Sequence, residues 1–223
     1  MSMDLIRHME LFNPYEFKDN VTIIGAGATG SWLALSLAKL GIENITVYDF
    51  DKVESHNVPN QAYTIGDAGM NASKVGALYA LIENQTGIKI DAKDEKYTNQ
   101  RLNGIVFLMV DSMAERKRIW EESIKMKSAI KLLVEPRMGL DVGRIYNVNP
   151  IDLNHIKKYE ETYYSDDVAE VSACGASMTV VTTSMSIASW CARQLINFHN
   201  NVELDNEILI DFMYNNIIST RWE

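Results

Sequence analysis

The chain has 223 residues, 47% hydrophobic and 23% charged, a composition typical of a protein with a sizeable buried core. Its formal net charge of −9 argues against a nucleic-acid-binding surface, because neutralising phosphates requires clustered lysine and arginine. No segment approaches the roughly 20 apolar residues of a membrane span, and the charged start lacks the apolar run of a signal peptide. We therefore predict one domain over residues 1–223 that binds neither nucleic acid nor membrane.

The two cysteines, Cys174 and Cys191, have no metal-ligand spacing between them and are too few for a disulfide framework. We therefore expect a cytoplasmic, reducing location. Cys191 lies beside Trp190 and Ala192 in a long predicted helix, where a small apolar side chain serves packing.

Strands and helices alternate along the first part of the chain. An apolar run at 21–24 predicts a buried strand, and apolar residues at helical spacing predict a helix from Ala28 to Leu40. Further strands are expected at 44–48, 88–92, 105–110 and 132–134, with helices at 72–82 and 113–126 and a loop from 49 to about 69. Such alternation is typical of a parallel sheet covered by helices on both faces.

The last third of the chain has a different character. Residues 144–148 are compatible with a strand, 151–167 read as loop or short helix, and 207–212 and 217–221 as two closing strands. The long segment 178–198 predicts a buried helix, because Arg193, Gln194 and repeated hydroxyls do not suit lipid. The predicted fold class is α/β, a Rossmann-like doubly wound, mainly parallel sheet with antiparallel strands at its C-terminal end.

A glycine-rich turn follows the first predicted strand and precedes the first predicted helix. Its sequence is Gly25-Ala26-Gly27-Ala28-Thr29-Gly30. Glycine permits a tight turn and close approach of phosphate, while the helix N-terminus supplies N–H donors and the positive end of a dipole. We therefore predict that Gly25, Gly27, Ala28, Thr29 and Gly30 bind phosphate, and that Asp49, at the end of the second strand, hydrogen-bonds ribose.

These features fit an NAD-dependent dehydrogenase equally well, and three others favour a different enzyme. A second acid, Asp51, follows Asp49, and the polar run Asn57-Val-Pro-Asn60-Gln61 comes shortly after. In addition, the sequence leaves no room for a separate catalytic domain of the usual dehydrogenase type. We therefore expect ATP rather than NAD.

The segment Tyr48-Asp-Phe-Asp-Lys-Val53, with Asn57–Gln61, resembles the signature D-x-D-x-V-x-x-x-N-x-x-R-Q of the ThiF, MoeB, HesA and ubiquitin-activating enzyme family. The resemblance runs from about Arg7 to the final strands and is strongest over 23–61. It implies an ATP- and Mg²⁺-dependent adenylyltransferase that activates the C-terminal carboxylate of a small ubiquitin-like or sulfur-carrier protein. It also implies a homodimer, an N-terminal arm over 1–20 and a crossover loop over 150–175.

The resemblance assigns roles by position. Asp49 would hold the ribose, Asn57 would help to position the phosphates, and Asp51, Asn60 and Gln61 would complete the nucleotide site. Lys74, in Asn71-Ala-Ser-Lys-Val-Gly76, matches a family lysine that would offset charge as pyrophosphate leaves. The alternative for Lys74 is a solvated lysine on a helix surface.

Asp111 begins the segment Asp111-Ser-Met-Ala-Glu-Arg116, which resembles the family's D-N-x-x-x-R. It directly follows a buried strand, and ligands bind at the carboxyl ends of strands in open α/β sheets. A carboxylate there would hold Mg²⁺ against the phosphates. The alternative is an N-cap role for the next helix. Arg116 is expected to be structural.

Two positions leave alternatives open. Arg7 resembles an arginine that in relatives reaches into the active site of the neighbouring subunit, although a surface charge on the N-terminus would look the same. Asn60 stands where the family has arginine, and an amide cannot replace a guanidinium on phosphate. Either another cation compensates, with Arg7, Lys52 and Arg137 as candidates, or the adenylation step is weakened. A further alternative is a degenerate site, in a nucleotide-binding scaffold or an inactive half of a heterodimer.

Cys174, in Val171-Ser-Ala-Cys-Gly-Ala176, precedes the long predicted helix. Some relatives transfer the activated carboxylate to a cysteine in a similar crossover region, and a position before a helix favours the thiolate. The alternative is a small packing residue. The acceptor is likewise open, since other branches of the superfamily adenylate a peptide or a small-molecule carboxylate.

Overall fold

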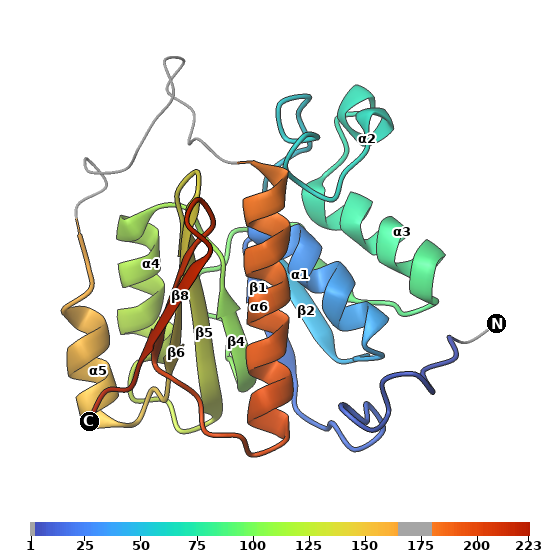
Figure 1. The fold of residues 1–223 in the computed structure, drawn as a ribbon. Helices are drawn as coiled ribbons and strands as arrows, with labels where there is room; N and C mark the ends of the chain where they lie inside the picture. Colours follow the sequence, from blue (N-terminus) through green and yellow to red (C-terminus); the bar gives the residue numbers. More distant parts are fainter. Residues whose placement is uncertain (1–2, 165–179) are drawn as a thin grey trace.

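The computed structural model describes residues 3–164 and 180–223. They form an eight-stranded sheet in the order β3-β2-β1-β4-β5-β6-β7-β8 (Figure 1). The first five strands are parallel: β1 (Val21–Ile24), β2 (Ile45–Tyr48), β3 (Asp91–Lys93), β4 (Gly104–Leu108) and β5 (Ile130–Met138). The last three pair antiparallel: β6 (Val142–Val148), β7 (Glu207–Asp211) and β8 (Asn216–Thr220). The predicted α/β class, mainly parallel with an antiparallel C-terminal end, is confirmed.

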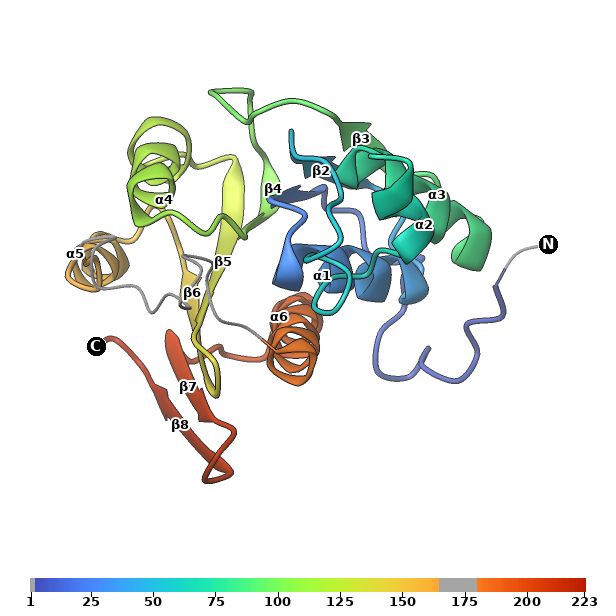
Figure 2. The ribbon, with the colours of Figure 1, turned by 90° about the horizontal axis from the view of Figure 1, so that it is seen from above.

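Helices cover both faces of this sheet (Figure 2). One face carries α1 (Ala28–Lys39), α3 (Lys74–Thr86) and α6 (Val181–His199). The other carries α4 (Met113–Ile119), its π-helical continuation η1 (Trp120–Ile124) and α5 (Leu153–Glu160). None of the helices in the described residues is long and apolar enough to cross a bilayer.

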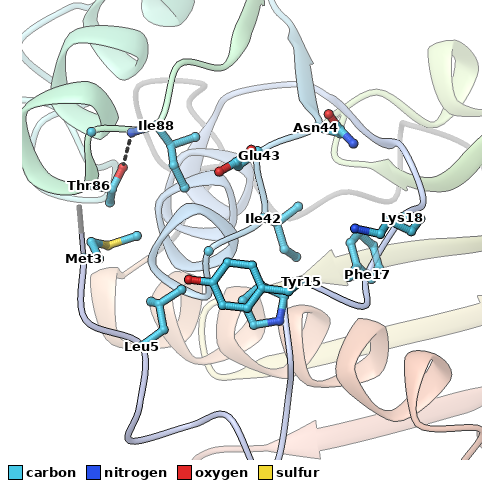
Figure 3. Close-up of a pocket in the computed structure, with 13 residues that line it drawn as sticks. Met3, Leu5, Tyr15, Phe17, Lys18, Ile42, Glu43, Asn44, Thr86 and Ile88 are labelled. Carbon is cyan, nitrogen blue, oxygen red and sulfur yellow. Dashed lines mark hydrogen bonds between the residues drawn. The ribbon is translucent and has the colours of Figure 1, made fainter.

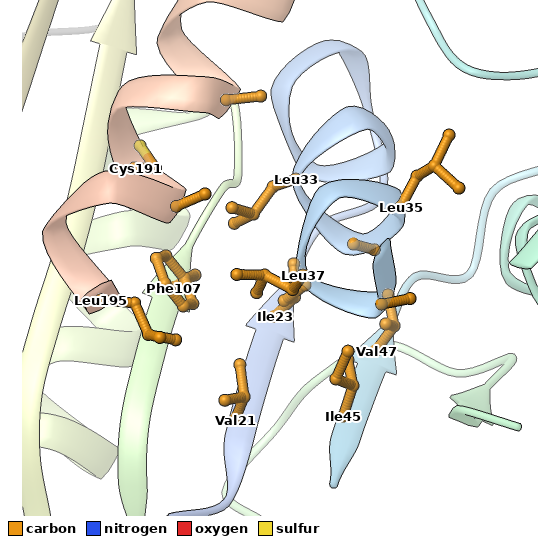
Figure 4. Packing of buried hydrophobic residues seen from close by; sticks show 14 of the residues in the cluster. Val21, Ile23, Leu33, Leu35, Leu37, Ile45, Val47, Phe107, Cys191 and Leu195 are labelled. Carbon is orange, nitrogen blue, oxygen red and sulfur yellow. The ribbon is translucent and has the colours of Figure 1, made fainter. Parts of the chain in front are cut away.

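The alternation of side chains along each strand divides the core into two clusters. In β4, Ile105 and Phe107 belong to the cluster under α1 and α6, whereas Val106 and Leu108 belong to the cluster under α4 and α5. Figure 4 shows the first cluster, in which Cys191 is fully buried. Burial raises the pKa of the Cys191 thiol well above its usual value, so the predicted packing role of this cysteine is confirmed.

Several predicted boundaries were wrong. Strand β5 extends well beyond 132–134, because the charged residues and proline that hide it in the sequence are themselves part of the strand. The short helix α2 (Ile65–Gly69) lies within the predicted loop and begins with a capping box between Thr64 and Asp67. The helix predicted at 113–126 continues as a π-helix after 119. The prediction of loop or short helix over 151–167 is confirmed in its described part, where α5 is a short helix.

Candidate functional site

The turn between β1 and α1 requires glycine at two positions. Gly25 has a φ of +102°, and a Cβ added there would lie 2.7 Å from the Met109 carbonyl oxygen. A Cβ on Gly30 would lie 2.0 Å from the carbonyl oxygen of Gly25. At Gly27, in contrast, an added Cβ would meet no atom of residues 3–164 or 180–223 within 4 Å. The turn is therefore packed tightly against β4 underneath and opens onto free space at Gly27.

The N-terminus of α1 faces this open space. Gly27 is the N-cap residue, and no side chain of the described residues caps the helix. The first-turn N–H groups of Ala28, Thr29 and Gly30 therefore sit at the positive end of the helix dipole without a side-chain acceptor, as at anion-binding helix ends. The buried hydroxyl of Tyr63 donates to the carbonyl oxygen of Ala26 at 2.6 Å and holds the turn from the other side.

Asp49 follows β2 and is bonded to the glycine turn. Its Oδ2 accepts from the Ala26 N–H at 2.7 Å, and its Oδ1 accepts from the Asp51 N–H at 2.8 Å. Burial raises the pKa of Asp49, and the nearby Lys74 ammonium opposes that rise. A carboxylate accepts about four hydrogen bonds, so its oxygens have capacity left for ribose hydroxyls.

Asp51 and Lys74 form an ion pair beside the same turn. The Lys74 Nζ lies 2.8 Å from the Asp51 Oδ2, and the Lys74 side chain is only 9% exposed. Lys74 is the first residue of α3, whose N-cap is Ser73. The interpretation of Lys74 as a solvated helix-surface lysine is therefore wrong.

The motif Asn57–Gln61 forms a folded loop next to α1. Asn57 is buried, and its Oδ1 accepts from the Glu54 N–H at 2.9 Å. The carbonyl oxygen of Asn60 accepts from Trp32 Nε1 and from Ser184 Oγ, both at 3.1 Å, which ties the loop to α1 and α6. The Oε1 of Gln61 is buried and has no hydrogen-bond partner among the described residues.

Asp111 lies on the same edge of the sheet, three residues after β4. The Met109 N–H donates to the carbonyl oxygen of Ile24 at 2.7 Å, so the β4 end is joined to the start of the glycine turn. The Asp111 side chain is exposed. The alternative N-cap role for Asp111 is wrong, because Ser112 is the N-cap of α4 and its Oγ accepts from the Glu115 N–H at 3.3 Å.

A second charged cluster lies below this edge and is fully buried. The carboxylate of Glu135 bridges the guanidinium groups of Arg116 and Arg137. Arg137 also donates to the carbonyl oxygen of Thr162 at 2.7 Å and to its Oγ1 at 2.9 Å, and it lies over the ring of Tyr146. Although burial opposes the charge, Glu135 raises the pKa of Arg137. The donors of Arg137 are thus used within this cluster. The suggestion that Arg137 replaces the family arginine at Asn60 is therefore wrong.

Arg116 is structural, as expected from the sequence. Its guanidinium is buried and donates to three backbone carbonyl oxygens: that of Leu108 at the end of β4, that of Val110 after it, and that of Pro136 in β5. These contacts fix the chain immediately before Asp111.

The N-terminal arm lies at the opposite end of the sheet. Residues 3–18 and the turns 41–44 and 86–88 enclose a cavity of about 490 Å³ (Figure 3). Because these turns precede β2 and β3, the cavity is at the amino ends of the strands. Arg7 is exposed on this arm, so within one chain the arm does not join Arg7 to the glycine turn. Cys174 lies outside the described residues.

The structure therefore assembles most of the predicted residues on one edge. Asp49, Asp51 and Lys74 are hydrogen-bonded in series beside the glycine turn, with Asp111 on the adjoining strand end. Lys52 is exposed next to Asp51, and its backbone bridges Ser73. Sequence reasoning missed Tyr63, Trp32 and Ser184, which only tertiary contacts connect to the site.

Comparisons with known proteins identify the family and the fold of the chain. The model of the ThiF family matches residues 17–223. Over 96 residues the chain is 32% identical to ubiquitin-like modifier-activating enzyme 5 of Bombyx mori, which is 42% of this chain and 24% of that protein.

Solved structures share the fold at low sequence identity. E. coli MccB has a TM-score of 0.72 and 16% identity, covering 94% of this chain and 66% of its own. PaaA has a TM-score of 0.71 and 16% identity, covering 94% and 65%. A structure of MccB with ATP gives 0.68 at 16% identity, covering 94% and 65%. The chain thus spans about two thirds of these structures and about a quarter of the Bombyx mori enzyme.

Proposed function

Because the chain belongs to the ThiF family, we propose that it is an adenylyltransferase that uses ATP to activate the C-terminal carboxylate of a small protein. The observation that carries the proposal is the uncapped N-terminus of α1, open at Gly27, beside the linked side chains of Asp49, Asp51 and Lys74. An NAD-dependent dehydrogenase would need the same turn but gives no role to a buried lysine at the start of α3.

The residues present fit ATP. A Cβ at Gly27 would intrude on the open space over the turn, and this open space at a helix N-terminus supports an approach of phosphate to the backbone there. The spare acceptor capacity of Asp49 suits ribose hydroxyls. Asp111 offers an exposed carboxylate, the ligand type that Mg²⁺ prefers.

The proposed reaction needs no protein nucleophile. An oxygen of the acceptor carboxylate forms a bond to the α-phosphorus of ATP, and the bond from that phosphorus to the bridging oxygen breaks, so pyrophosphate leaves with the electron pair. The chain contributes by positioning and charge neutralisation. The N-terminus of α1 and the Lys74 ammonium stabilise the phosphates, and Asp49 orients the ribose. Mg²⁺, which Asp111 would hold, supplies further positive charge.

ATP–pyrophosphate exchange tests this proposal, with small proteins that end in glycine as acceptors. Lys74→Ala and Asp111→Ala should each lower the exchange rate at least 100-fold, as expected for the loss of a group that stabilises charge in the transition state. Each should lower the exchange rate far more than it lowers the free energy of unfolding. Lys89→Ala is a matched control, because this exposed lysine follows the far end of α3. Wild-type exchange by either site variant would refute its assigned role.

The same experiment separates a catalyst from a scaffold. A protein that binds MgATP but gives no exchange with any acceptor would be the degenerate alternative that Asn60 suggests. Since Arg137 is committed elsewhere, Lys52 and Arg7 are the cations left to compensate for Asn60. Lys52→Ala should then lower the exchange rate, and an unchanged rate would remove Lys52 from consideration.

A second candidate acceptor is a peptide. It is favoured by the likeness in fold to MccB, structures of which contain MccA. The ubiquitin-like carrier is favoured instead by the identity to the Bombyx mori enzyme. A panel of carrier proteins and of peptides with free C-terminal carboxylates, read by mass spectrometry of the adenylated product, distinguishes the two.

We also propose that the chain acts as a homodimer in which Arg7 serves the neighbouring site. The proposal follows the family resemblance, and it would give a role to an arginine that lies at the amino ends of the strands, away from the glycine turn of its own chain. Sedimentation would show the dimer, and mixing Arg7→Ala with Lys74→Ala chains should restore part of the exchange rate. For Cys174, a carrier adduct that disappears with a reducing thiol and with Cys174→Ala would establish the nucleophile role.

A further inference from the structure

The ion pair of Asp51 and Lys74 is held by the backbone on both sides. The Lys74 N–H donates to the carbonyl oxygen of Asp51 at 2.9 Å, and the Val53 N–H donates to that of Ala72 at 2.8 Å. Between them, Lys52 and Ser73 form an antiparallel bridge. The segments that contain Lys52 and Ser73, more than twenty residues apart in the sequence, are thus joined by a short backbone ladder. The ion pair of Asp51 and Lys74 lies at one end of this ladder.

The two partners of the pair differ in exposure. The Lys74 side chain is 9% exposed, whereas the Asp51 side chain is 50% exposed. Packing therefore fixes the stem of Lys74, and the 2.8 Å bond to Asp51 fixes the direction of its ammonium. An ammonium has three donors, of which this bond uses one. The direction of the other two follows from it.

Asp51 is also linked to the ribose end of the site. Its N–H donates to Asp49 Oδ1 at 2.8 Å, and Asp49 Oδ2 accepts from Ala26 in the glycine turn. A chain of hydrogen bonds therefore runs from the turn through Asp49 and Asp51 to Lys74. Direct contact between the anionic Asp51 carboxylate and a triphosphate would be repulsive. Asp51 therefore acts on nucleotide binding through its bond to the Lys74 ammonium.

We propose that Asp51 is a positioning residue that aims the Lys74 ammonium at the phosphates of ATP and does not itself bind the nucleotide. This rests on the proposed function and replaces the sequence-based prediction that Asp51 is a nucleotide ligand. Asp49, which would contact the ribose, and Lys74, which would contact the phosphates, then belong to one hydrogen-bonded network.

Calorimetric titration with MgATP tests whether removal of the Asp51 carboxylate weakens or tightens nucleotide binding. Asp51→Ala should weaken MgATP binding about 10-fold or more, because charge-assisted bonds to phosphate are strong only when aligned. Asp51→Asn, which keeps an oxygen acceptor for Lys74, should lose less. If Asp51 were merely a nearby negative charge, its removal would tighten MgATP binding. Glu54→Ala is the matched control, because Glu54 is an exposed acid three residues away.

Variants of Lys74 give the second arm. In a Lys74→Ala background, Asp51→Ala should have no further effect on MgATP affinity, since its contribution acts through the ammonium. Additive losses would show that Asp51 contacts the nucleotide directly and would overturn the inference, as would tighter binding by Asp51→Ala. Wild-type protein that binds no MgATP would overturn the proposed function itself, and the inference with it. Thermal unfolding of each variant confirms that it is folded.

Discussion

Two groups of opposite charges lie near the carboxyl ends of the parallel strands, and they differ in how completely their hydrogen bonds are used. In the buried cluster, Glu135 is fully enclosed and is shared by Arg116 and Arg137. Backbone carbonyls and Thr162 accept from most of the remaining donors, and the Arg116 Nε has no partner among the described residues. In the site beside the glycine turn, Asp51 is half exposed and Asp49 has acceptor capacity left.

The comparison shows that a charged side chain at the ligand-binding edge of an α/β sheet is not by itself a ligand. A group with every partner supplied by the protein stabilises the fold, whereas a group with spare donors or acceptors facing open space is available for binding. From the sequence, Arg137 was a candidate for phosphate and Lys74 had a surface alternative. The hydrogen bonds of Arg137 within the buried cluster remove the first interpretation, and the burial of the Lys74 side chain removes the second.

The largest expected effect comes from removing the shared carboxylate. Glu135→Gln leaves the guanidinium groups of Arg116 and Arg137 buried without an anion, which should lower the free energy of unfolding by about 3–5 kcal/mol. Urea unfolding measures it. Glu207→Gln removes the partner of Arg144 in a more exposed pair and should cost less than about 1 kcal/mol. Equal losses in the two variants would contradict the distinction between the clusters.

The sequence predicted the elements whose patterns are strong and local. The apolar runs at 21–24 and 105–110 are buried on both faces and correspond to β1 and β4, and the glycine turn between β1 and α1 requires Gly25 and Gly30 for steric reasons. Strand β5 was underestimated because Glu135, Pro136 and Arg137 lie inside it. Charges in a central strand are tolerated only because distant residues pair with them, and no local pattern reports that pairing.

The site was predicted only in part, because the sequence does not report which distant residues its side chains contact. A motif gives the order of Asp49, Asp51 and Lys74, but not that Asp51 bonds to Lys74. The short helix α2 has a sequence signal, the capping box of Thr64 and Asp67, although its two glycines hide any helical periodicity. The contacts of Trp32 and Ser184 with the Asn60 carbonyl join segments that only the fold brings together.

The next largest effects distinguish the glycine that stabilises the turn between β1 and α1 from the glycine that leaves room for phosphate. Gly30→Ala places a Cβ against the Gly25 carbonyl and should cost about 1–3 kcal/mol or more of unfolding free energy. Gly27→Ala meets nothing and should cost about 1 kcal/mol or less, the expected loss at an N-cap. Its methyl group nevertheless occupies the space where phosphate would approach, so MgATP affinity should fall at least 10-fold. Calorimetry on the folded Gly27→Ala protein is decisive, because unchanged affinity would remove phosphate from that space.

The smallest expected effect is the pH dependence of stability that Asp49 confers. Because burial raises its pKa above the usual value of 3.8, the folded protein binds this proton more tightly than the unfolded chain does. The stability that protonated Asp49 contributes is therefore fully present below the unfolded pKa and is lost as pH rises through the folded pKa.

Asp49→Asn has no such titration, although it loses one acceptor for the N–H groups of Ala26 and Asp51 at every pH. The unfolding free energy of the wild type minus that of Asp49→Asn should therefore decrease as pH rises from about 4 to neutrality. Urea unfolding of both proteins at each pH gives this difference. A difference that increases with pH would mean that the Lys74 ammonium outweighs burial at Asp49, and the two charged clusters would then resemble each other more than their exposure suggests.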